Sequence, residues 1–126
     1  VARHFAGLGF VAVNVTYPLA PEYTWPSGAE SVSHAVDWVR ANIGDYRGDP
    51  ERIYLMGHSA GGNHVANYVF RPSLSSGSGP SVAGVIVASP ALELDPLGPA
   101  EPYAAYFQND LSSWAEIRLL ENATLP

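Results

Sequence analysis

Six consecutive residues, Gly57-His58-Ser59-Ala60-Gly61-Gly62, have the types and the spacing that a nucleophilic serine needs. An apolar run precedes them and a helix-forming run follows, so Ser59 is predicted at the apex of a sharp turn between a strand and a helix. Such a turn holds the serine Oγ clear of the backbone and close to a backbone N–H, here that of Ala60, which can stabilise an oxyanion. It also needs glycine two residues before and two residues after the serine, at Gly57 and Gly61, where a Cβ would collide. We call residues Gly57–Gly62 the elbow.

A second interpretation of Ser59 is purely structural. Serine is a favoured N-cap, because its hydroxyl accepts a hydrogen bond from a backbone N–H in the first turn of a helix. Ser59 would then only begin the helix predicted over Asn63–Phe70. The Gly-x-Ser-x-Gly spacing is short enough to arise by chance, so its context has to decide. A strand before the serine and glycines on both sides favour the catalytic interpretation.

The elements that would position the elbow alternate between strand and helix. Three apolar segments are predicted as strands covered on both faces: Phe10–Tyr17, Ile53–Met56 and Val82–Ala88. Apolar residues at helical spacing predict a helix from Ser27 to Ile43, with Ser27 and Glu30 as a capping box. This order predicts an α/β fold with a mostly parallel sheet, three strands of which are present, and one domain over residues 1–126.

Composition and charge exclude several function classes. The net charge is −6 with only six lysines and arginines, which argues against a nucleic-acid partner. The absence of cysteine excludes a disulfide framework, a thiolate zinc site and a cysteine nucleophile. No metal-ligand spacing and no glycine-rich phosphate-binding motif is present, so we expect neither a metal nor a cofactor.

The sequence says less about the compartment. No apolar run approaches the ~20 residues of a membrane span, and no signal peptide is visible. We read Val1 as a cut end, because the chain opens in the middle of a pattern. The sequence therefore favours the cytoplasm without fixing the location, and it does not reveal the oligomeric state.

Three segments, in their order and spacing, resemble the hormone-sensitive-lipase-like carboxylesterases of the α/β-hydrolase fold. They are Tyr17-Pro18-Leu19-Ala20-Pro21-Glu22 with the following Trp25-Pro26, then Gly48-Asp49-Pro50-Glu51-Arg52-Ile53, and the elbow. Two positions depart from the family pattern: Pro18 stands where arginine is usual, and His58 where many members have aspartate. Gly-His-Ser-Ala-Gly-Gly is also similar to the arylformamidase and feruloyl-esterase-like branches.

The resemblance implies hydrolysis of small-molecule carboxylic esters through an acyl-enzyme on Ser59, with the Ala60 N–H in the oxyanion hole. It also implies the chain order serine, acid, histidine. No histidine follows His64, and we expect neither His64 nor the adjacent His58 to reach the serine Oγ. The remaining candidates lack the expected setting; they are His4, His34, Asp95 and Asp110. The acid and the base are therefore expected beyond residue 126, and these residues alone are expected to be inactive.

The resemblance further implies that the chain is the central part of a single α/β-hydrolase domain. A glycine-rich oxyanion loop and its strand are expected upstream, with that strand lying between Phe10–Tyr17 and Ile53–Met56 in the sheet. Two flanking strands without it would have unpaired backbone groups, which are costly when buried. The isolated 126 residues are therefore expected to be marginally stable or to aggregate.

Three alternatives remain open at this point. An amidase such as an arylformamidase, or a peptidase of the prolyl-oligopeptidase type, would use the same elbow. A catalytically dead hydrolase fold could instead serve only for binding. Such proteins often lose the serine or its glycines, and all of them are intact here, which favours an enzyme.

Overall fold

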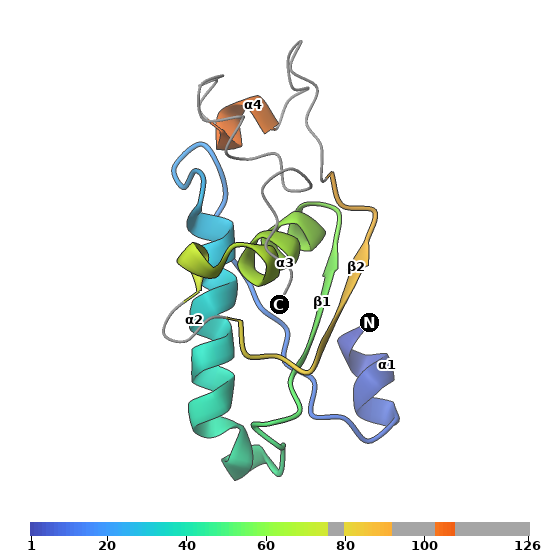
Figure 1. The fold of residues 1–126 in the computed structure, drawn as a ribbon. Coiled ribbons are helices and arrows are strands. Elements are labelled where there is room, and N and C mark those ends of the chain that lie inside the picture. Colours follow the sequence, from blue (N-terminus) through green and yellow to red (C-terminus); the bar gives the residue numbers. More distant parts are fainter. Residues whose placement is uncertain (76–79, 92–102, 108–126) are drawn as a thin grey trace.

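The computed structural model describes residues 1–75, 80–91 and 103–107 (Figure 1). Helices in these ranges are α1 (Ala2–Gly7), α2 (Ser27–Asn42), α3 (Ala60–Phe70) and α4 (Tyr103–Tyr106), with 3₁₀ helices η1 (Ile43–Tyr46) and η2 (Pro72–Leu74). The strands are β1 (Tyr54–His58) and β2 (Gly84–Ala88). None of these helices combines the length and the apolarity that a membrane-spanning helix requires.

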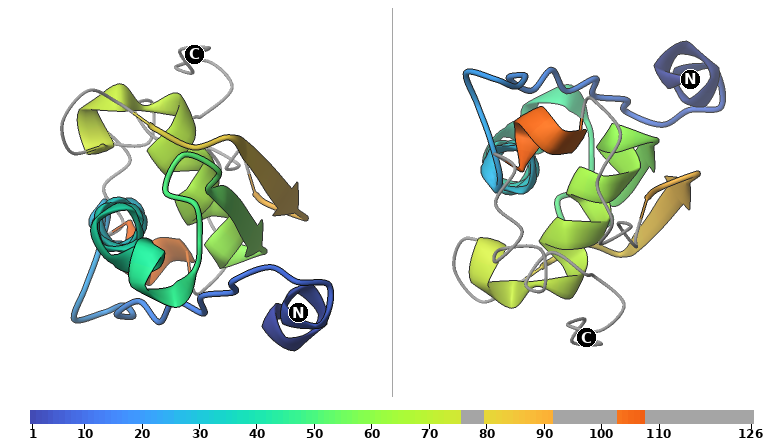
Figure 2. Two further views of the ribbon diagram at one scale, coloured as in Figure 1. Left: turned by 90° about the horizontal axis from the view of Figure 1, so that it is seen from below. Right: turned by 90° about the horizontal axis from the view of Figure 1, so that it is seen from above.

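The two strands form a parallel sheet against which α3 packs. Their register runs from Tyr54 opposite Gly84 to His58 opposite Ala88. Helix α3 lies between this sheet and α2, whereas α1 lies at the other side of the sheet (Figures 1 and 2). Two parallel strands joined through a helix form a βαβ unit, which confirms the predicted α/β class with its parallel pairing.

The core lies where α2, α3 and β1 meet. Its buried members are Val36 from α2, Ile53 before β1, and Tyr68 and Val69 from α3. The apolar stripe predicted for the first long helix is therefore correct, and that helix begins at Ser27 as predicted. The predicted capping box is wrong: Pro26 is the N-cap of α2, and no side-chain hydrogen bond caps the helix.

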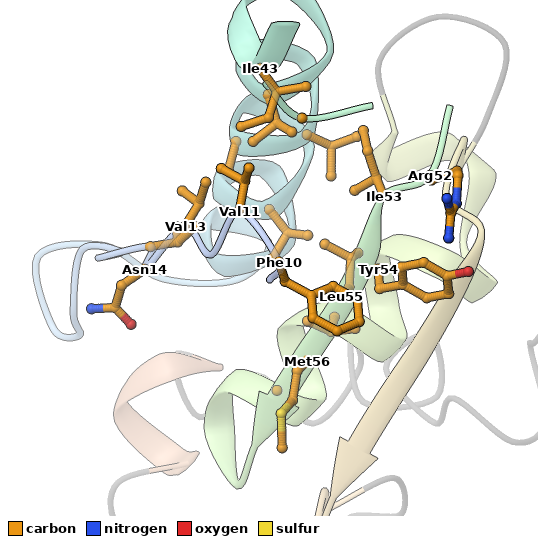
Figure 3. A pocket seen from close by; sticks show the side chains of 18 of the residues that line it. Phe10, Val11, Val13, Asn14, Ile43, Arg52, Ile53, Tyr54, Leu55 and Met56 are labelled. Carbon is orange, nitrogen blue, oxygen red and sulfur yellow. The ribbon is translucent and has the colours of Figure 1, made fainter. Parts of the chain in front are cut away.

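The prediction of three strands is also wrong, since two strands are found in the described ranges. Residues 10–17 have no regular secondary structure, although Val11, Val13 and Val15 have the composition of a strand. A strand forms only where a neighbour's backbone groups lie about 4.8 Å away. A cavity of about 670 Å³ separates residues 10–17 from β1 instead (Figure 3).

This cavity is mainly apolar. Figure 3 shows Phe10 and Val11 at one wall, with Ile53, Leu55 and Met56 along the β1 side. Burial on both faces of the strands was predicted and does not hold here, because α3 covers only one face. Met56 is 46% exposed and Val13 is also 46% exposed.

We expect the isolated 126-residue chain to associate through this cavity lining. Contiguous exposed apolar surface binds hydrophobic dyes and favours aggregation. The apparent molar mass from light scattering should therefore rise with protein concentration and a hydrophobic dye should fluoresce on binding, and replacing Val11 and Val13 by serine should weaken both signals. A matched double change on the exposed face of α2, Asp37→Ser with Ala41→Ser, should leave them unchanged. A monomeric chain with a cooperative thermal transition and no dye binding would contradict the expectation.

Candidate active site

Ser59 occupies a strained turn at the carboxyl end of β1. Its φ is 52° and its ψ is −122°, a region that residues other than glycine rarely adopt, and the residue is exposed. The Ser59 N–H donates to the Ala88 carbonyl oxygen at 2.9 Å, which ties the turn to the end of β2. The Ser59 carbonyl oxygen accepts from the Asn63 N–H at 3.1 Å, which opens α3. The strand-turn-helix predicted for the elbow is therefore present.

The structure does not support the interpretation of Ser59 as a side-chain cap. Ser59 does stand at the N-cap position of α3, but its hydroxyl makes no capping hydrogen bond. A cap also normally has φ and ψ in the β region, whereas this φ is positive. The backbone strain at Ser59 is therefore not offset by a capping hydrogen bond to its hydroxyl. Strained backbone of this kind is concentrated at functional sites.

Ala60 is the first residue of α3 and is exposed. Backbone N–H groups in the first turn of a helix have no acceptor within the helix. The helix dipole adds partial positive charge at the same end. The Ala60 N–H is thus in a position that suits the predicted oxyanion contact, beside Ser59 at the carboxyl end of the parallel strands, where ligands of open α/β sheets bind.

The glycines of the elbow differ in whether they leave room for a side chain. A Cβ on Gly57 would overlap the Gly61 carbonyl oxygen and come within 2.6 Å of its carbon and 2.8 Å of the Gly62 Cα. All three atoms are backbone, so the predicted collision at Gly57 is confirmed. The predicted collision at Gly61 is wrong, because a Cβ there would meet nothing within 4 Å. Position 61 already lies in regular helix and borders the apolar cavity, so a Cβ there has open space.

The histidines are distributed over different elements. His4 and His34 are exposed on α1 and α2, and His58 is the exposed last residue of β1. His64 is buried within α3, at 7% exposure. Asp95 and Asp110 lie outside the described residues. Within the described ranges, no three histidine, aspartate or glutamate side chains are grouped as a metal ion would require.

His64 lies in an aromatic contact that the sequence did not reveal. Its ring centroid is 4.6 Å from that of Tyr17 and 5.4 Å from that of Tyr106. Its imidazole also fills the space beside Gly28 in the first turn of α2, which a Cβ would occupy. Tyr106 closes the group, because its hydroxyl accepts from the Gly28 N–H at 3.0 Å. Burial lowers the pKa of His64 from its usual 6.5.

We expect this burial to make stability depend on pH. In the unfolded chain His64 has its ordinary pKa, so between the two pKa values the unfolded state binds the extra proton. The free energy of unfolding therefore does not depend on the titration of His64 above pH ~6.5. As the pH falls below ~6.5, the free energy of unfolding decreases by at most about 1.4 kcal/mol per pH unit. Urea unfolding at pH 7.5 and pH 5.5 should show the loss, and His64→Phe should reduce it. The exposed His34 is the matched control: an equal reduction in His34→Phe would contradict this assignment.

The apolar cavity borders the elbow without including Ser59. Gly57, His58, Gly61 and His64 line it, and Ser59 is not among the described residues that do so. The cavity therefore reaches the β1 side of the turn, while Ser59 and Ala60 are exposed at the end of the strand.

Comparisons with known proteins agree with the three segments that carried the resemblance. A family model described as alpha/beta hydrolase fold matches residues 1–125. The chain is similar to Esterase LipQ of Mycobacterium tuberculosis, with 44% identity over 59 residues, which are 47% of this chain and 14% of LipQ. Carboxylesterase NlhH of the same species is 45% identical over 64 residues, 50% of this chain and 20% of NlhH.

A plant relative extends the similarity along almost the whole chain. Carboxylesterase 20 of Arabidopsis thaliana is 28% identical over 124 residues, which are 94% of this chain and 33% of that protein. The chain thus spans a third or less of the length of these three relatives.

Proposed function

This chain belongs to the alpha/beta hydrolase fold family, and we propose that its Ser59 is the nucleophile of an enzyme that hydrolyses carboxylic esters of small molecules. The observation that carries the proposal is the exposed, strained Ser59 between β1 and α3, whose hydroxyl caps no helix. Relatives named esterase and carboxylesterase support an ester as the bond that is cleaved.

The proposed reaction has two halves. The Ser59 Oγ attacks the ester carbonyl carbon while a histidine base takes its proton, and the resulting oxyanion faces the Ala60 N–H. The bond to the alcohol oxygen then breaks, the alcohol leaves with the proton held by the base, and the acyl group stays on Ser59. Water, deprotonated by the same base, attacks the acyl-enzyme and releases the acid and the free serine.

The base and its orienting acid are proposed to come from residues outside this sequence. Among the histidines here, His64 is held between Tyr17 and Tyr106, and its contacts leave it no role at Ser59. His58 is the exposed last residue of β1, directly before Ser59, and we propose no part for it in the proton transfer. In this proposal the chain supplies the nucleophile and one oxyanion donor, and turnover needs the full-length parent protein.

Labelling and turnover in that parent protein test the proposal. A fluorophosphonate probe reacts only with an activated serine, so we expect one labelled peptide, which contains Ser59. Short p-nitrophenyl esters should be hydrolysed faster than N-formylkynurenine. The reverse preference would indicate an amidase of the arylformamidase kind. Absence of both labelling and hydrolysis would indicate a binding protein and overturn the proposal.

A further inference from the structure

A second strained serine lies beside the first. Ser89 follows the last residue of β2, as Ser59 follows the last residue of β1, and the register places His58 opposite Ala88. Ser89 has a φ of 49° and is exposed. Among the described residues other than glycine, only Arg47, Ser59 and Ser89 have a positive φ. Two of the three therefore stand next to each other at the carboxyl edge of the sheet.

The two residues that flank Ser89 lie close to the elbow. On one side, the Ala88 carbonyl oxygen accepts the Ser59 N–H at 2.9 Å. On the other, the Pro90 Cβ lies 3.4 Å from where a Cβ on Gly62 would stand, and the Ala88 oxygen lies 3.5 Å from the same point. The positive φ of Ser89 therefore accompanies a backbone that has Ala88 bonded to Ser59 and Pro90 near Gly62, whereas an extended residue would continue the direction of β2.

We infer that Ser89 is a positioning residue for Ser59, an inference that rests on the proposed function. Its left-handed turn holds residues 88–90 as a brace on the first turn of α3. The brace fixes the direction of the Ser59 backbone and of the adjacent Ala60 N–H. Reacting groups need this fixing because small errors in geometry cost large factors in rate. Ser89 acts through its backbone conformation, and its hydroxyl is not required.

Substitutions in the full-length protein separate conformation from side chain. Ser89→Val should disfavour the left-handed turn strongly, because β-branched residues rarely adopt it. We expect kcat to fall at least about tenfold with KM unchanged. Here kcat is calculated per active site, and the number of active sites is titrated with the fluorophosphonate probe. Ser89→Gly should keep the wild-type kcat, because glycine adopts this conformation freely. Arg47→Val is the matched control, since Arg47 has a φ of 64° and lies after η1, before the start of β1. It should lower Tm and leave kcat unchanged.

Hydrogen exchange at the Ser59 amide gives a readout that does not need activity. Ser89→Val should speed exchange at this amide at least about tenfold, whereas Arg47→Val should not. Unchanged exchange in Ser89→Val would overturn the brace. Faster exchange with an unchanged kcat would overturn the positioning role. If the wild-type protein hydrolyses no ester, the proposed function and with it the positioning role fail, while the exchange result still decides whether the brace exists.

Discussion

Alanine in place of Ser59 is expected to lower the kcat of the full-length protein for p-nitrophenyl esters by about 10⁴- to 10⁶-fold. In the proposed reaction the Ser59 hydroxyl is the group that forms the acyl-enzyme, and no other side chain replaces it once the ester carbonyl is bound. Residual rate would come from the oxyanion donors and substrate binding alone. Folding should be preserved, because Ser59 is exposed and its hydroxyl makes no capping hydrogen bond.

The control for this variant is a serine of similar exposure outside the elbow. Ser73 in η2 is exposed, so Ser73→Ala should retain the wild-type kcat and Tm. Circular dichroism melting of both variants checks that neither loses its structure. Substantial turnover by Ser59→Ala, after removal of any contaminating esterase, would refute the assignment of the nucleophile.

Alanine in place of Gly57 is expected to cost about 3–5 kcal/mol of unfolding free energy and to abolish activity. The new Cβ would overlap the backbone of Gly61 and Gly62, and backbone cannot rotate away as a side chain can. Relief requires α3 to move away from β1, which also moves Ser59 and Ala60. Urea unfolding measures the first effect, and fluorophosphonate labelling of the remaining folded protein measures the second.

Gly61→Ala is the matched variant on the other side of Ser59. Nothing lies within 4 Å of its Cβ position, and the residue is in α3. Alanine is a better helix former than glycine by about 0.5–1 kcal/mol, so stability should be kept or slightly raised. A loss in Gly61→Ala as large as that in Gly57→Ala would show that the backbone contact at Gly57 is not the cause.

Local sequence spacing predicted most of the elements near the site, although the capping box of α2 and the collision at Gly61, which also rest on local spacing, were wrong. The stripe of α2, the strand before the elbow and the elbow itself follow from residues a few positions apart. The segment around Val11 and Val13 shows where such reasoning stops. Its composition is that of a strand, but a strand forms only between two segments that pair, and no described segment pairs with residues 10–17.

The candidate site also has some features that neighbouring residues predict and others that depend on residues far apart in the chain. The turn at Ser59 was predictable because glycine and serine spacing encodes it. The contact of His64 with Tyr17 and Tyr106 was not, because it joins positions 17, 64 and 106 and has no periodic signal. The left-handed Ser89 was missed for a related reason. No glycine marks that turn, so only the three-dimensional structure reveals it.

The surroundings of the turn at Ser59 have one more property, which concerns the order in which a ribosome makes them. The Ser59 N–H bonds to the Ala88 carbonyl oxygen, a Cβ on Gly57 would overlap Gly61, and a Cβ on Gly62 would stand 3.4 Å from the Pro90 Cβ. All of these residues belong to one stretch, 54–90, built around the β1–α3–β2 unit. Synthesis therefore completes the residues that shape this turn by residue 90. In the proposed reaction the base follows later in the chain, so a newly made elbow takes its shape before it has the partner that would make Ser59 reactive.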